Sequence, residues 1–133
     1  MKRYKIGITF GAYEIWHIGH LNLIKQAKAR CKKLIVCVSN DEYIKVKKNH
    51  ISVIPLKYRK ELIEALKYVD AVDVQSLSCG KRELVEKYQP DVIFVGNDWT
   101  PDTFTGEGLG VPVVYLERTK GISSTLLRNK YFK

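Results

Sequence analysis

The chain of 133 residues has too few cysteines to build a disulfide framework or a zinc ribbon. Cys31, Cys37 and Cys79 are odd in number and form no CxxC pair, so neither structure is expected. Histidine is also scarce, because His50 is the only one outside the pair His17 and His20. Metalloprotease helices space their histidines i,i+4 around a glutamate, whereas this pair is spaced i,i+3, so a zinc site is not favoured.

Long apolar runs and targeting signals are absent as well. No apolar run is long enough to cross a membrane, and the sequence contains no repeat, low-complexity segment or linker. The basic start Met1–Lys5 precedes an apolar stretch, as in a signal peptide, but Glu14 and His17 interrupt it and no cleavage site follows. We therefore expect one domain over residues 1–133, in the cytoplasm and without a membrane partner.

Acidic residues are outnumbered, with 14 Asp and Glu against 23 Lys and Arg, which gives a net charge of +9. A basic chain favours anionic partners such as nucleic acid, a membrane surface or phosphorylated metabolites. The basic residues are densest at Lys45, Lys47, Lys48, Lys57, Arg59 and Lys60. A nucleic-acid-binding module would interleave aromatic and basic residues on one face, but the tyrosines here are scattered, so no nucleic-acid partner is expected.

Apolar runs alternate with helical patterns along the chain. The expected strands are Ile6–Phe10, Leu34–Val38, Val72–Val74, Val92–Val95 and Val113–Leu116. The expected helices are Gly19–Arg30, Lys57–Tyr68, Lys81–Tyr88 and Ser123–Lys130. This alternation predicts an α/β fold in which helices cover both faces of an open parallel sheet.

Three polar segments that contain glycine follow three of these strands. They are Gly11–His20, Gly96–Trp99 and Glu117–Thr125. Ligands of open α/β sheets bind outside the carboxyl ends of the strands, so the three segments are expected to line one crevice.

The pair His17 and His20 is predicted to lie one turn apart at the start of a helix. Gly19 leaves space for a ligand to approach the backbone, and the helix N-terminus offers N–H donors to an anion. Two imidazoles there can donate hydrogen bonds to phosphate oxygens and stabilise the charge that develops during phosphoryl attack. Capping or packing is the alternative role for each histidine.

The segment "RTKGISST" also suits a phosphate ligand. Arg118 presents a fork of donors, Gly121 permits a tight turn, and Ser123–Thr125 places three hydroxyls at a helix start. Helix capping needs only one of these hydroxyls. In "GNDW", Asp98 can bind a base, a ribose or a metal, or it can form an Asx turn, and Trp99 can stack on a base or close a loop over the core.

Together these motifs resemble the small bacterial cytidylyltransferases of the HxGH nucleotidyltransferase superfamily, and among them those that act on glycerol 3-phosphate. The resemblance spans nearly the whole chain, through "HIGH" (17–20), "VSNDEY" (38–43), "YRKELIEALKYVD" (58–70), "GNDW" (96–99) and "VVYLERTKGISST" (113–125). It implies a Rossmann-like fold, a homodimer, and transfer of CMP from CTP to a phosphate monoester with Mg²⁺ and release of pyrophosphate.

The resemblance also implies roles for individual residues. The implied catalytic residues are His17, His20 and Arg118. The implied nucleotide-binding residues are Phe10, Gly11, Ala12, Gly19, Gly96, Asp98, Thr119, Gly121, Ile122, Ser123 and Ser124. Arg59 and Lys47, or a lysine next to it, are implied to bind the phosphate of the acceptor or those of CTP. No metal ligand is implied.

The chain departs from the family at Gly11-Ala12-Tyr13-Glu14, where the family usually reads G-T-F-D. Ala12 lacks a hydroxyl and Glu14 lengthens a carboxylate, so the change bears on the identity of the acceptor. Glycerol 3-phosphate is the first choice, and phosphocholine, phosphoethanolamine or another phosphorylated metabolite would use the same machinery. Adenylyl transfer to FMN or phosphopantetheine is the second enzymatic reading, and a nucleic-acid-binding module is the non-enzymatic one.

Overall fold

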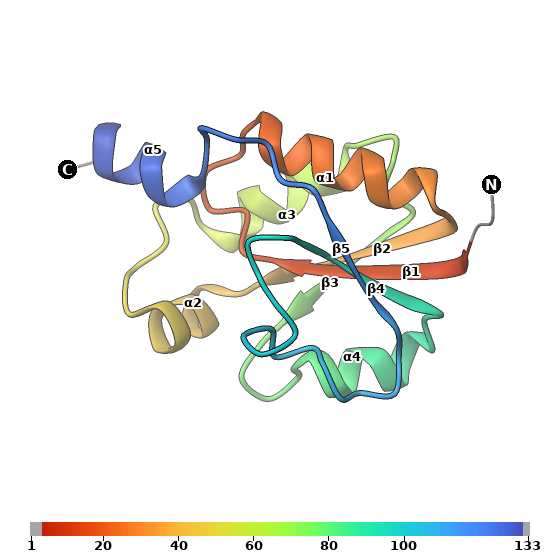
Figure 1. Ribbon diagram of the computed structural model, residues 1–133. Helices are drawn as coiled ribbons and strands as arrows, with labels where there is room; N and C mark the ends of the chain where they lie inside the picture. Colours follow the sequence, from red (N-terminus) through yellow and green to blue (C-terminus); the bar gives the residue numbers. More distant parts are fainter. Residues whose placement is uncertain (1–3, 132–133) are drawn as a thin grey trace.

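Five parallel strands form the central sheet, in the order β3-β2-β1-β4-β5 (Figure 1). The computed structural model describes residues 4–131. The strands are β1 (Tyr4–Gly11), β2 (Cys31–Ser39), β3 (Ala71–Gln75), β4 (Val92–Gly96) and β5 (Val113–Leu116). The helices are α1 (Ile18–Ala29), α2 (Asp41–Lys48), α3 (Leu56–Glu64), α4 (Lys81–Tyr88) and α5 (Ser124–Tyr131).

Helices cover both faces of the sheet. Figure 1 shows α1 and α3 above the sheet, α4 below it, and α2 and α5 beside the carboxyl ends of the strands. Each face has its own core, because successive strand side chains point in opposite directions. Val36 packs with Ile24 and Ile63 under α1 and α3, whereas Ile35 packs with Leu84 of α4. The predicted α/β class is therefore confirmed.

The topology creates a switch point beside β1. From β1 the chain builds β2 and β3 on one side of the sheet, and then crosses to build β4 and β5 on the other side. Connections that leave β1 and β4 therefore diverge at the carboxyl end of the sheet, which is where open α/β sheets bind ligands. Within residues 4–131, no helix is long and apolar enough to cross a membrane.

Two helices differ from the prediction. Helix α3 ends at Glu64, because the N–H groups of Leu66 and Val69 donate to carbonyls three residues earlier and form turns instead of continuing the helix. Helix α2 was not among the predicted helices, although its lysines were noted as part of a basic cluster and Lys47 as a candidate phosphate ligand. It buries only Ile44, so few apolar residues mark it in the sequence. Its N-cap is the clearer feature, since the side chain of Asn40 accepts from the N–H of Tyr43.

Candidate functional site

A cleft of about 270 Å³ lies at the carboxyl ends of β1 and β4. Most of the predicted site residues line it, and they come from all three predicted segments: Phe10, Gly11, Ala12, His17, Gly19, His20, Gly96, Asp98, Arg118, Thr119, Ile122, Ser123 and Ser124. The three segments thus line a single crevice, as predicted from their places after the strands. Gly121, Lys47 and Arg59 do not line this cleft.

The two histidines of the cleft cap helix α1 with their Nδ1 atoms. The N–H of Gly19 donates to Nδ1 of His17 at 3.0 Å, and the N–H of His17 donates to Nδ1 of His20 at 3.3 Å. The rings stack with their centroids 3.8 Å apart. Because each Nδ1 is an acceptor, each neutral ring has its proton on Nε2. Capping and ligand binding are therefore compatible here, since the Nε2–H donors have no partner within residues 4–131.

Burial keeps both rings neutral. Loss of solvation lowers the pKa of His17, and it lowers the pKa of His20 to about 3, with the charges of His17 and Lys48 acting in the same direction. At neutral pH the pair therefore offers two N–H donors at the start of a helix, where backbone N–H groups and the helix dipole also favour an anion.

Gly19 makes room for a protein side chain. A Cβ atom built on Gly19 would lie 2.8 Å from Cε1 of His17, closer than real Cβ atoms approach other atoms. The absence of a side chain at Gly19 therefore allows the His17 ring to fold back over the helix start. The space beside Gly19, which was expected to admit a ligand, is therefore occupied in part by the His17 ring.

The opposite wall of the cleft comes from the segment between β5 and α5. Ser123 caps α5, because its Oγ accepts from the N–H of Leu126 at 3.0 Å. The hydroxyl of Ser124 donates to the carbonyl of Ile15 at 3.1 Å and so ties α5 to the loop that follows β1. Gly121 does not line the cleft, and its φ of 82° permits the turn that precedes α5, so its nucleotide-binding role stays a prediction.

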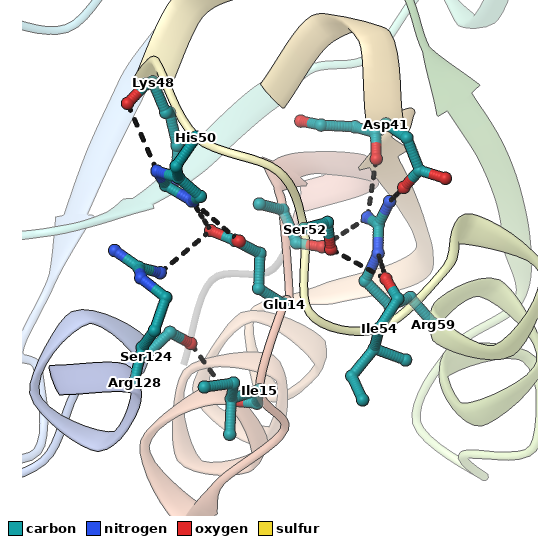
Figure 2. Close-up of polar contacts among 12 residues, drawn as sticks. Glu14, Ile15, Asp41, Lys48, His50, Ser52, Ile54, Arg59, Ser124 and Arg128 are labelled. Carbon is teal, nitrogen blue, oxygen red and sulfur yellow. Dashed lines mark hydrogen bonds and ion pairs between the residues drawn. The ribbon is translucent and has the colours of Figure 1, made fainter. Parts of the chain in front are cut away.

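Arg59 is buried in the framework around the cleft (Figure 2). Its Nη1 donates to the carbonyls of Ala12 and Ser39 at 2.7 and 2.6 Å, and its Nε donates to the carbonyl of Ile54 at 2.8 Å. Nη2 pairs with the carboxylate of Asp41. Arg59 thus connects the loop after β1, the end of β2, the start of α2 and the loop before α3. With its donors directed at protein acceptors and only 1% of the residue exposed, it is not available to a substrate phosphate. This corrects the phosphate-binding role predicted for it.

A buried carboxylate connects three segments at the mouth of the cleft (Figure 2). Both oxygens of Glu14 contact Nε2 of His50, at 2.8 and 2.9 Å, and Nη1 of Arg128 lies 3.5 Å away. Nδ1 of His50 lies 3.2 Å from the carbonyl of Lys48. This cluster, which we call the Glu14 clasp, was missed in the sequence because no local spacing relates positions 14, 50 and 128.

A second cavity, of about 400 Å³, lies between α2 and the start of α4. We call it the basic cavity, and its lining includes Tyr43, Lys47, Gln75, Ser76, Lys81 and Arg82. The two neighbouring lysines of α2 are thus divided, because Lys48 lines the cleft and Lys47 lines the basic cavity. Lys47 therefore lies at the basic cavity and not at the cleft, and its phosphate-binding role stays a prediction.

A doubly wound α/β sheet with an HxGH helix start at its switch point is the arrangement of a nucleotidyltransferase. The cytidylyltransferase-like family matches residues 8–130, and the chain belongs to that family. It is 34% identical over 125 residues to the glycerol-3-phosphate cytidylyltransferase of Staphylococcus aureus, covering 94% of this chain and 93% of that enzyme. The protein is a nucleotidyltransferase, which confirms the resemblance found in its motifs.

Two further comparisons extend this result. The chain is 38% identical over 98 residues to an FAD synthase of Thermococcus kodakarensis, covering 73% of this chain and 66% of that protein. The fold matches a lipopolysaccharide core biosynthesis protein of Thermoplasma volcanium with a TM-score of 0.74 and 23% identity, covering 87% of this chain and 98% of that one. The FAD synthase is named for a different reaction from the cytidylyltransferase. The likeness to the Thermoplasma volcanium protein supports the fold alone.

Proposed function

We propose that the protein transfers CMP from CTP to a small phosphate monoester, with glycerol 3-phosphate as the first choice, and releases pyrophosphate. The observation that supports this most strongly is the pair of neutral imidazoles, whose Nε2–H groups have no protein acceptor within residues 4–131. A relative that is named for this reaction and is aligned over almost its whole length adds support.

The cleft suits an in-line displacement. An oxygen of the acceptor phosphate attacks the α-phosphorus of the nucleotide, and the bond from that phosphorus to the pyrophosphate oxygen breaks. The nucleophile is already ionised, so no general base is required. His17 and His20 donate to the phosphate oxygens as negative charge builds up, and Arg118 adds positive charge from the opposite wall. Positioning and charge stabilisation then provide most of the catalysis.

Magnesium fits this site as a companion of the triphosphate. No group of three His, Cys, Asp or Glu side chains within residues 4–131 could hold a metal ion by itself. Mg²⁺ needs only one or two protein carboxylates when substrate phosphates supply other ligands. Asp98 lines the cleft and has no ion-pair partner in the described part of the chain, so it is the carboxylate that would hold the ion. The bound ion would neutralise charge on the phosphates.

Adenylyl transfer to FMN is the second candidate, because the FAD synthase relative is as similar in sequence as the cytidylyltransferase. Both reactions use the same phosphate chemistry, so the catalytic residues do not separate them. The base of the nucleotide distinguishes the two reactions, because the nucleotide that binds the folded state more tightly raises the melting temperature more. Selective stabilisation by CTP supports the first reading, and selective stabilisation by ATP supports the second.

The decisive test is pyrophosphate release with Mg²⁺, using CTP with glycerol 3-phosphate in one arm and ATP with FMN in the other. Release in the first arm that is lost in His17→Ala is the expected result. Release only in the second arm would replace CMP transfer with AMP transfer, and release in neither arm would contradict both. The predicted homodimer is tested by light scattering after size-exclusion chromatography, where the mass of a single chain would contradict it.

A further inference from the structure

The second histidine of the cleft is contacted by three other rings. The rings of Trp16 and His17 both stack on that of His20, with centroids 5.4 and 3.8 Å from it and with 24° between the planes in each pair. The ring of Tyr13 meets His20 edge to face, 5.0 Å away and at 71°. Tyr13 and Trp16 also contact each other, with centroids 6.2 Å apart. Ring contacts therefore hold His20 in addition to the hydrogen bond at its Nδ1.

That hydrogen bond is too long to fix the ring by itself. The N–H of His17 lies 3.3 Å from Nδ1 of His20, beyond the ordinary range for a donor of this kind. The last side-chain torsion of a histidine has a broad energy minimum, so a weak hydrogen bond leaves the direction of Nε2–H loosely defined. A stacked neighbour restricts this rotation, because turning the imidazole would break the parallel contact.

Trp16 is anchored by the core and not by the cleft. Its indole packs against the buried cluster that includes Ile24 and Val36. Trp16 does not line the cleft, whereas His17 and His20 both do. A substrate in the cleft would therefore meet the histidines, and Trp16 would act on it only through the ring on which it stacks.

The backbone before Trp16 is strained in a way that supports these contacts. Tyr13 has a φ of 51°, in the left-handed region that a bulky side chain rarely adopts. This conformation directs the buried Tyr13 ring against both Trp16 and His20. Strain of this kind persists only where the surrounding structure fixes it, and it clusters at functional sites.

The same rings keep water away from His20. Burial is the main cause that lowers the pKa of His20 to about 3, and the charges of His17 and Lys48 lower it further. The phenol of Tyr13 adds no charge, because burial raises its pKa. The other charged or titratable side chains that line the cleft are those of Glu14, His50, Asp98 and Arg118. Removal of Trp16 would expose one of the stacked faces and raise the pKa of His20 toward 6.5.

We propose that Trp16 is a positioning residue: by stacking on His20, it directs the Nε2–H of that ring toward the nucleotide phosphates and shields the ring from water. This role rests on the nucleotidyl transfer proposed above, and it applies equally to CTP and ATP because both present the same phosphates. A displacement of about 1 Å at a catalytic group costs about 100-fold in rate. Loss of the stack should therefore lower kcat more than it weakens binding.

Steady-state kinetics of Trp16→Leu and Trp16→Phe test this role, with the nucleotide and acceptor that the wild type turns over. We expect kcat to fall about tenfold to a hundredfold in Trp16→Leu, while the nucleotide KM changes less than about threefold. Trp16→Phe keeps a ring that can stack on His20 and should retain most of the wild-type kcat. Urea denaturation checks that each variant is folded, and Trp16→Met replaces Trp16→Leu if the latter does not fold.

The matched control is Tyr4→Leu. Tyr4 packs against the same core cluster and contacts Phe94, but it lies at the amino end of β1, away from the cleft. Its loss should lower the free energy of unfolding without lowering kcat. An unchanged kcat in Trp16→Leu, an equal loss in Tyr4→Leu, or a loss that Trp16→Phe does not rescue would overturn the positioning role while nucleotidyl transfer stands.

If the wild type turns over neither nucleotide, the proposed function fails instead, and NMR titration of the histidine ring signals tests Trp16 alone. His20→Gln identifies the signal of His20. In the wild type this ring should stay neutral at about pH 5, and in Trp16→Leu its pKa should rise toward 6.5. Identical titrations in the two proteins would overturn the role of Trp16.

Discussion

His17 and His20 stack with ring centroids 3.8 Å apart, and each directs Nδ1 toward the start of α1 and keeps a proton on Nε2. A single pair of rings therefore stabilises the helix with one set of nitrogens and can bind phosphate with the other. The two roles can be separated by substitutions that keep the capping acceptor.

His17→Asn is the variant that makes this separation at the first position. Asparagine is a preferred N-cap residue, so its side-chain oxygen can accept from the N–H of Gly19 and the free energy of unfolding should change by less than about 1 kcal/mol. The Nε2–H donor is lost, and we expect kcat to fall about 100-fold to 1000-fold. Turnover and urea denaturation measure the two effects. Normal turnover in a folded His17→Asn protein would exclude a catalytic role for His17.

The low pKa of His20 predicts how stability depends on pH. The folded protein keeps this ring neutral down to about pH 3, whereas the unfolded chain protonates it below its ordinary pKa of 6.5. The unfolded state thus binds more protons in this interval, so the free energy of unfolding should fall as the pH decreases from 6.5 toward 3. His17 acts in the same direction.

Urea denaturation at several pH values measures this slope. His20→Gln is the control, because glutamine at the third helical position can still accept from the backbone N–H of the cap but does not titrate. The slope should be shallower in His20→Gln than in the wild type. Identical slopes would mean that His20 protonates equally in the folded and unfolded states.

The sequence predicted the sheet and the cleft because their signals are local. Buried parallel strands are short apolar runs, and the polar segments that follow them must meet at one edge of the sheet, so His17, Asp98 and Arg118 could be assigned to the same crevice. The spacing of the two histidines at a helix start was equally local. For these residues the local motif alone was sufficient to predict their place in the cleft.

Residues with long-range partners could not be assigned in the same way. The family resemblance implied that Arg59 binds phosphate, but the carbonyls that accept from it come from positions 12, 39 and 54. Only the folded chain brings such partners together.

Arg59→Lys tests the structural role of this arginine. A lysine has no planar fork, so it cannot replace the donors that join Ala12, Ser39 and Asp41, and the buried carbonyls of Ala12 and Ser39 would be left without partners. We expect the free energy of unfolding to decrease by about 3 to 5 kcal/mol. Any folded fraction should keep a normal KM for the acceptor. A stable Arg59→Lys protein with a raised acceptor KM would restore the substrate-binding role that the buried position argues against.

Glu14→Gln tests whether the Glu14 clasp holds the cleft in shape. The substitution keeps the size of the side chain but removes the negative charge that faces His50 and Arg128 from within the protein, where Glu14 is only 3% exposed. We expect a loss of about 1 to 3 kcal/mol in the free energy of unfolding, since charged hydrogen bonds in buried positions are worth that much. The nucleotide KM should rise as well, because Lys48 and Ser124 of the cleft walls lie on segments that the clasp connects.

Arg128→Gln is the control, because it removes only the longer contact of Glu14. It should have the smaller effect on the free energy of unfolding, measured by urea denaturation, and on the nucleotide KM, measured by steady-state kinetics. If Glu14→Gln changes stability but not the nucleotide KM, the clasp supports the fold without shaping the cleft.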